Sequence, residues 1–273
     1  MTADLRAEVT TAIARVRERS PLVHGAIGSV TRALVADGLL AAGARPMLTE
    51  NVAEAPTLVT VADALLINLG SLSADGMAGF VPTARAAHER GIPWVLDPTA
   101  IGLAPVRTPI AHDLCALGPT VVRGNASEIL TLSGGGRGGR GADSTATPDD
   151  AATAARRLAQ GRCIVAVSGE RDLITDGERT IRVTGGSAML TRVSGTGCLL
   201  GGLTAALLAV AAGGTQAKGV TPFACAVAAT ALLTVAADRV GAMGPGSFRV
   251  ALLDALDAVS AAEVGDGVGL AWE

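Results

Sequence analysis

Short apolar segments that end in a polar residue alternate with helical patterns along this chain, and this alternation constrains the fold more than any other feature. We expect strands at residues 64–69, 94–97, 120–123 and 163–167. Helical patterns separate them at residues 74–90 and 109–117, from Asn125, and from Thr147. Because parallel strands need a crossover between them, usually a helix, the pattern predicts a three-layer α/β fold. Its central sheet is expected to be mostly parallel, with helices on both faces.

Two local signals refine this expectation. Thr147-Pro148-Asp149-Asp150 combines a hydroxyl cap, a proline at the first helical position and acids in the first turn, which predicts a helix start. Residues 172–183, with a break at Asp176-Gly177, predict an antiparallel hairpin at a sheet edge. With 273 residues, 49% of them hydrophobic, and neither a repeat nor a linker, residues 1–273 are expected to form one domain.

Polar residues stand where the expected strands end. Asn68, Asp97, Arg123 and Ser168 each occupy such a position. In open, mostly parallel sheets, ligands bind beyond the carboxyl ends of the strands. These four residues are therefore the first candidates for a functional site.

The segment VSGTGCLLGG, residues 193–202, is typical of a glycine-rich turn that opens a long apolar helix. Ser194 or Thr196 can cap this helix, and its first amides, at the positive end of the helix dipole, can bind an anion. A transferred phosphoryl group held there is stabilised by those amides. Cys198 lies at the same helix start, where a thiol pKa is lowered, so it can act as a base or as a polar neighbour of an attacking hydroxyl. The alternative is a structural turn with an inert small residue under the helix.

Asn125-Ala-Ser-Glu128 has two compatible interpretations. It is a capping box, with Asn125 at the N-cap and Glu128 three residues later. It also brings a carboxylate to a strand-to-helix junction where Mg²⁺ can bind beside phosphates, and Asp97 offers a second carboxylate at a strand end. Arg123 can clamp a phosphate or pair with an acid as a structural residue.

Composition excludes several classes of protein. Only 17% of the residues are charged and the net charge is -3, so nucleic acid is not an expected partner. A glycine- and arginine-rich stretch, residues 133–141, is interpreted as a loop. The four cysteines form no CxxC pair, which argues against a zinc site or a disulfide framework and favours a reduced cytoplasmic compartment. The first 20 residues mix acids with arginines and lack the apolar core of a signal peptide.

Two uncharged spans, residues 193–217 and 219–237, are long enough to cross a bilayer. They are rich in alanine, the first opens with glycines and hydroxyls, and neither is flanked by a basic cluster or an aromatic belt. We interpret them as helices buried in a protein core and expect no membrane partner.

Eight stretches, taken together and in this order, resemble the hydroxyethylthiazole kinase family of the ribokinase-like group. They are VADGLLAAGARP, ADALLINLGSLS, PWVLDPTAIG, VVRGNASEIL, RGADST, VAVSGERDLITDGER, TRVSGTGCLL and GPGSF. The resemblance implies a ribokinase-like fold and phosphorylation by ATP, with Mg²⁺, of the primary hydroxyl of 4-methyl-5-(2-hydroxyethyl)thiazole in thiamine salvage. Most ribokinase-like kinases carry Asp where this chain has Cys198, and the thiazole kinases are the branch with Cys.

The resemblance also implies roles for single residues. Gly195, Thr196, Gly197 and Cys198 would form the anion hole and the group next to the attacking hydroxyl. Arg123 and Ser168 match positions that contact ATP, Asp97 and Glu128 match acids near Mg²⁺, and Leu48 and Gly195 match positions that contact the substrate. The family assembles as a homotrimer with each site at a subunit boundary. A mean hydropathy of +0.44 agrees with a surface that needs covering.

One region departs from the family pattern. After Pro21-Leu-Val-His24 the family reads Cys-x-Thr-Asn, whereas this chain reads Gly25-Ala-Ile-Gly28, and Leu48 stands where a methionine is usual. Three alternatives therefore stay open: a ribokinase-like kinase for another small alcohol, a pyrimidine kinase or hydrate dehydratase of the same fold, and a non-catalytic binder. The last two are less favoured, because the sibling enzymes carry Asp at the position of Cys198 and the SGTGC and NASE stretches are intact.

Overall fold

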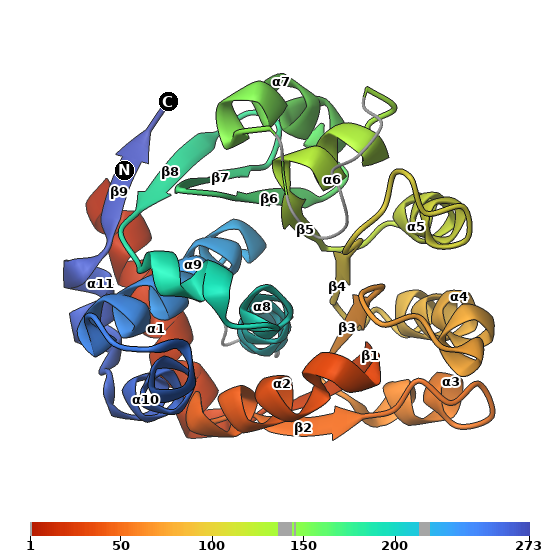
Figure 1. Ribbon diagram of the computed structural model, residues 1–273, viewed down its shortest axis with the longest axis horizontal. Helices are drawn as coiled ribbons and strands as arrows, with labels where there is room; N and C mark the ends of the chain where they lie inside the picture. Colours follow the sequence, from red (N-terminus) through yellow and green to blue (C-terminus); the bar gives the residue numbers. More distant parts are fainter. Residues whose placement is uncertain (1, 136–143, 145, 213–218) are drawn as a thin grey trace.

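The computed structural model describes residues 2–135, 144, 146–212 and 219–273. Within them a single nine-stranded sheet runs in the order β2-β1-β3-β4-β5-β6-β7-β8-β9 (Figure 1). The strands are β1 (Leu22–Ile27), β2 (Arg45–Leu48), β3 (Ala64–Asn68), β4 (Trp94–Asp97), β5 (Val121–Asn125), β6 (Ile164–Ser168), β7 (Arg171–Thr175), β8 (Thr180–Thr184) and β9 (Gly269–Trp272). Strands β1 to β6 are parallel, which confirms the mostly parallel sheet.

The expected hairpin exists, but it does not form a sheet edge. Strands β7 and β8 pair antiparallel, and β9 then pairs antiparallel with β8 on its outer side. The ring of Trp272 stacks on Phe223 at 5.9 Å between centroids, which fixes this last strand against a helix. The edge assignment was wrong because β9 is a short C-terminal segment whose partner is remote in sequence.

Helices cover both faces of the sheet, as expected (Figure 1). One face carries α1 (Thr2–Arg19), α2 (Ser29–Ala41), α8 (Thr196–Ala212), α9 (Pro222–Val240), α10 (Pro245–Ala258) and α11 (Ala261–Gly267). The other carries α3 (Ala55–Leu58), α4 (Ala74–Glu89), α5 (Arg107–Ala116), α6 (Ala126–Leu132) and α7 (Pro148–Ala159). Two hydrophobic cores result, one on each side of the sheet. The three-layer α/β fold is confirmed.

The capping signals in the sequence form the predicted helix starts. The Thr147 hydroxyl accepts from the amide of Asp150, and the Asp150 carboxylate accepts from the amide of Thr147. Asn125 and Glu128 form the same reciprocal pair at the start of α6. Because these bonds join residues three apart, they could be predicted without knowledge of the fold.

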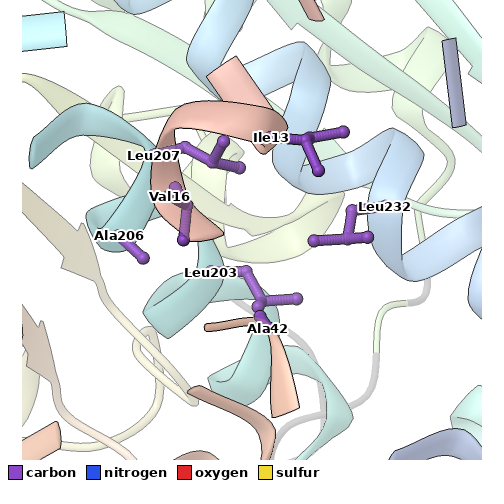
Figure 2. Close-up of a pocket in the computed structure, with 7 residues that line it drawn as sticks. All are labelled: Ile13, Val16, Ala42, Leu203, Ala206, Leu207 and Leu232. Carbon is purple, nitrogen blue, oxygen red and sulfur yellow. The ribbon is translucent and has the colours of Figure 1, made fainter. Parts of the chain in front are cut away.

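Helices α8 and α9 begin within the two uncharged spans, and each takes up most of its span. Helix α9 is long and apolar enough to cross a membrane, but 78% of its apolar window is buried inside the protein. The two helices pack against each other, and the Cys225 thiol donates to the carbonyl of Leu207. Figure 2 shows a small apolar cavity between α1, α8 and α9, lined by Leu203, Leu232 and neighbouring apolar side chains. The burial agrees with the interpretation of both spans as core helices.

Candidate functional site

The four polar residues predicted at strand ends meet near the carboxyl edge of the sheet, although Arg123 lies two residues before the end of β5. Asn68 at the end of β3 stands in register with Asp97 at the end of β4. Ser168 at the end of β6 stands in register with Asn125 of β5. Helix α8 begins above this edge and packs against β3 and β4. The sheet and the start of α8 thus bring together the residues predicted from widely separated motifs.

Arg123 links three parts of this edge. Its Nη1 atom donates to Oδ2 of Asp97 at 3.1 Å and to the carbonyl of Gly197 in α8 at 2.8 Å. Its Nη2 atom donates to Oγ of Ser168 at 2.6 Å. Burial disfavours the charge, but Asp97 and Glu128 outweigh it and raise the pKa of Arg123. The structural ion pair is therefore present, and it holds the guanidinium beside the first turn of α8.

Glu128 is a buried carboxyl whose two oxygens both accept backbone amides. Oε1 accepts from Ala100 at 2.7 Å, and Oε2 accepts from Asn125 at 2.8 Å. Burial and the nearby Asp97 carboxylate raise the pKa of Glu128 to about 7, although the two amides lower it. Two carboxylates therefore face one guanidinium, which leaves excess negative charge at the edge.

This donor set fits a hard divalent cation. Asp97 and Glu128 supply carboxylate oxygens, and a cation beside them would relieve the cost of ionising Glu128. Within the described part of the chain, no three His, Cys, Asp or Glu residues form a complete ligand set. Mg²⁺ commonly binds through one or two carboxylates, with waters and substrate phosphates completing its octahedron. Asp97 and Glu128 therefore have the chemistry of a Mg²⁺ site that protein carboxylates share with substrate phosphates.

The turn before α8 differs from its expected cap. Gly195 has φ +95°, a conformation that a side chain would strain, and its carbonyl accepts from the amide of Leu199. Thr196 is already the first helical residue, and its hydroxyl donates backward to the carbonyls of Leu190 and Val193 at 2.7 and 3.3 Å. The prediction that Ser194 or Thr196 caps the helix was therefore wrong, because Gly195 directly precedes α8 and neither residue stands at its N-cap position. The first amides of α8, at Gly197 and Cys198, have no partner within the helix and can face an anion.

The pKa expectation for Cys198 was also wrong. Its side chain is 8% exposed, and burial together with the Asp97 carboxylate raises the thiol pKa. Hydrogen bonds from Thr31 and Asn68 and the charge of Arg123 lower it by less. Desolvation is thus the largest effect on this thiol, and Cys198 is neutral at neutral pH.

Three residues at this edge were missed by the sequence analysis. Thr31, on α2, acts on the Cys198 thiol and lowers its pKa. Thr99 donates to Oδ1 of Asp97 at 2.7 Å, and Nη1 of Arg107 donates to the carbonyl of Gly70 at 2.8 Å. Thr99 follows Asp97-Pro98 and could have been suspected as a strand-end hydroxyl. Thr31 and Arg107 come from remote helices and carry no local signal.

The loop after β4 contains a strained residue. Ala100 has φ +60°, in the left-handed region that non-glycine residues seldom adopt. In this conformation its amide points at Oε1 of Glu128. The strain is therefore tied to the placement of that carboxyl.

The wall formed by β1 and β2 differs from what the family pattern implies. Leu48 is half-buried at the end of β2, on the same face of the sheet as α8, and its side chain lies over Gly25. Ile27 is fully buried in the core on that face. At Gly28 a side chain has no room, because a Cβ atom there would lie 2.1 Å from the carbonyl oxygen of Ser71. An asparagine at position 28 cannot be accommodated on this backbone.

Comparison with known proteins identifies the family. The chain matches the hydroxyethylthiazole kinase family over residues 13–262. This protein belongs to that family. It is 48% identical over 249 residues to a hydroxyethylthiazole kinase of Clavibacter sepedonicus, covering 90% of this chain and 88% of that protein. It is 45% identical over 242 residues to one of Klebsiella pneumoniae, covering 88% and 91%.

Solved structures agree with this assignment to the hydroxyethylthiazole kinase family. A hydroxyethylthiazole kinase protein from Pyrococcus horikoshii superimposes with a TM-score of 0.85 at 32% identity, over 97% of this chain and 98% of that one. A pyridoxal kinase from Staphylococcus aureus in complex with pyridoxal superimposes with a TM-score of 0.56 at 18% identity, over 80% and 88%. The second likeness concerns the fold alone. The predicted family membership and ribokinase-like fold are confirmed.

Proposed function

We propose that this chain is a single-domain kinase that transfers a phosphoryl group from ATP to the primary hydroxyl of 4-methyl-5-(2-hydroxyethyl)thiazole, in thiamine salvage. The observation that carries the proposal is the junction of Arg123, Ser168 and the first turn of α8 at one edge of the sheet, in a member of the hydroxyethylthiazole kinase family. Donors converge there on the position where negative charge develops in phosphoryl transfer.

The phosphates of ATP are held from two sides in this proposal. The amides of Gly197 and Cys198 donate from the start of α8, and Arg123 with Ser168 donates from the strand ends. Arg123 is already anchored by Asp97 and by the carbonyl of Gly197, so its position changes little on binding. This preorganisation lowers the cost of stabilising the transferred group.

Cys198 lies beside the attacking hydroxyl in this proposal. Its raised pKa makes it a neutral thiol, so it orients the alcohol without taking its proton, which passes late in the transfer to a phosphoryl oxygen or to water. A loose phosphoryl-transfer transition state needs little base assistance. The thiol therefore contributes mainly by position, as a polar neighbour.

Asp97 and Glu128 would hold Mg²⁺, which would offset the negative charge of the phosphates. Of the two acids, Glu128 gains more from the cation, because its pKa of about 7 reflects unfavourable ionisation. Arg123 orients Asp97 through its ion pair, so that this carboxylate is placed to bind the cation.

We also propose a cytoplasmic homotrimer. Support for assembly comes from exposed apolar side chains on α2 and α10, which pack against each other: Val30, Leu40 and Val250 are 69%, 59% and 62% exposed. Support for a reduced compartment comes from the free thiols at Cys115, Cys163, Cys198 and Cys225. Light scattering at micromolar concentration tests the trimer, and a monomer would contradict it.

A second candidate is a kinase for a less polar primary alcohol. It is favoured by the wall of Gly25, Ile27 and Leu48, which is built of apolar residues where the family pattern has a polar pair and exposes only part of Leu48. Each missing hydrogen bond to a buried heteroatom costs about 0.5–1.5 kcal/mol. The thiazole would then bind roughly tenfold to a hundredfold more weakly than in a relative with the polar pair.

Initial rates of ATP consumption against a panel of primary alcohols test these proposals. The panel contains the thiazole alcohol, a benzene analogue with the same hydroxyethyl arm, pyridoxal and a hydroxymethylpyrimidine. We expect phosphorylation of the thiazole and of its apolar analogue, with a KM for ATP that is the same for both. No activity on any member would contradict the kinase, and activity confined to pyridoxal or the pyrimidine would contradict the substrate class.

A further inference from the structure

Asn68 occupies the centre of the carboxyl edge. It is the last residue of β3, its register partners are Ile27 on β1 and Asp97 on β4, and its side chain is 1% exposed. A buried carboxamide must find partners for two N–H groups and one oxygen. Its contacts therefore report what the fold requires of it.

The orientation of the Asn68 carboxamide is fixed by a partner that can only donate. The amide of Gly70 donates to Oδ1 at 2.9 Å, so the amino group must face the opposite way. Nδ2 then donates to Oγ1 of Thr99 at 3.1 Å and to Sγ of Cys198 at 3.3 Å. Thr99 can accept, because its own hydrogen is donated to Asp97. This orientation of the Asn68 carboxamide is therefore consistent with every hydrogen bond from Gly70 through Thr99 to Asp97.

We propose that Asn68 is a positioning residue for Cys198, whose sulfur it holds as a hydrogen-bond acceptor at the start of α8. This role for Asn68 rests on the proposed function in one respect, which is that the positioned thiol serves phosphoryl transfer. Thr31 on α2 also lowers the thiol pKa, so groups on both strand β3 and helix α2 act on the sulfur. The charged groups that act on the sulfur are Asp97 and Arg123.

A purely structural role for Asn68 is separable from this one. The turn after β3 uses Oδ1, whereas the contact with Cys198 uses Nδ2. Asn68→Ser keeps a hydroxyl that can accept the Gly70 amide, as in the turns that serine forms, but it is too short to reach the sulfur. Asn68→Asp keeps the oxygen for Gly70 and replaces the donor with a second, negatively charged oxygen that faces the sulfur.

Two measurements distinguish positioning from structure. The first is the rate at which methyl methanethiosulfonate modifies Cys198 at a fixed pH of about 8, followed by mass spectrometry of the peptide that contains it. Loss of the donor disfavours the thiolate, so we expect modification several-fold slower in Asn68→Ser and more than tenfold slower in Asn68→Asp. Local unfolding would expose the thiol and make modification faster, which is the opposite sign.

The second measurement is kcat with the thiazole alcohol. We expect a fall of about threefold to tenfold for Asn68→Ser, with an unchanged KM for ATP. In a Cys198→Ala background the same change should alter kcat by less than twofold, because its partner is gone. Thr83→Val is the matched control, since it removes a buried hydroxyl on α4 that donates to Gly79 and touches neither Asn68 nor Cys198.

Modification of Cys198 that is as fast as in wild type, or faster, in both variants would overturn the proposal, as would an equal loss of kcat with and without the thiol. The modification rate needs no kinase activity. If the chain does not phosphorylate the thiazole at all, slower modification in both variants would still support the contact, so failure of the proposed function is distinguishable from failure of this inference. If Asn68→Asp does not fold, Asn68→Ser decides the question alone.

Discussion

The Cδ2 atom of Leu48 lies 2.5 Å from the point that a Cβ atom at Gly25 would occupy. One leucine on β2 thus fills the space that a side chain on β1 would need. The wall beside the proposed alcohol site is apolar because these two positions exclude each other's side chains. At Gly28 the obstacle is instead the backbone of Ser71.

Alanine substitutions at the two glycines should therefore behave differently. At Gly25 the end of the flexible Leu48 side chain can rotate away, so Gly25→Ala should cost less than about 1.5 kcal/mol of unfolding free energy and should change the KM of the alcohol. At Gly28 a carbonyl must move, so Gly28→Ala should cost about 1–3 kcal/mol or more. Urea denaturation measures the two unfolding free energies, and initial rates measure the KM of the alcohol. Equal stability losses would contradict the difference in surroundings.

Breaking the buried ion pair should be costly. Arg123→Met leaves Asp97, 1% exposed, without its partner, so we expect a loss of about 3–5 kcal/mol of unfolding free energy and of nearly all activity. The matched control is Arg239→Ala, which removes an ion pair with Glu263 whose side chains are about half exposed. That change should cost about 0–1 kcal/mol. Similar costs for the two variants, measured by denaturation, would contradict the role of burial.

Ala100→Gly should stabilise the protein. The left-handed conformation costs alanine about 1–2 kcal/mol, and part of this gain is lost to the greater freedom of glycine in the unfolded chain. We expect a net increase of up to about 1 kcal/mol in unfolding free energy. Ala7→Gly, at an exposed position inside α1, is the control and should lose about 1 kcal/mol. A loss of stability in Ala100→Gly would show that the loop is not strained there.

The buried Glu128 should make stability depend on pH. Its pKa of about 7 lies above the ordinary glutamate pKa of 4.5, so between these pH values the folded protein keeps a proton that the unfolded chain has released. The contribution of Glu128 to unfolding free energy therefore falls by about 2–3 kcal/mol as pH rises from about 4.5 to 7. Glu128→Gln lacks this titration, so its stability relative to wild type should improve over that window. Parallel stability profiles would contradict the raised pKa. Added Mg²⁺ should raise the unfolding free energy of wild type more at pH 8 than at pH 5. It should also raise the unfolding free energy of Glu128→Gln less than that of wild type.

The parts of this structure that could be predicted from the sequence depend on contacts close along the chain. The caps at Thr147 and Asn125 join residues three apart. Each polar residue predicted at a strand end follows directly on the apolar stretch that predicts the strand. The sequence pattern could not place β9 beside β8, because that pairing joins residues far apart.

Two site properties were missed for a related reason. The contact between Thr31 and Cys198 depends on how α2 packs against α8. The thiol pKa depends on how deeply the start of α8 is buried, because desolvation is the largest effect that raises it. A helix start can be recognised from sequence, whereas its solvent exposure cannot.

The most direct test of the proposed transfer site is the single-turnover rate of phosphoryl transfer in Cys198→Ala. If the thiol lies beside the attacking hydroxyl, the rate should fall by roughly tenfold to a hundredfold while ATP binding is unchanged. Cys198→Asp should retain activity, because Asn68 hydrogen-bonds the side chain at this position and can donate to a carboxylate. A Cys198→Ala enzyme that transfers the phosphoryl group at the full wild-type rate would contradict the placement of the reaction at the start of α8.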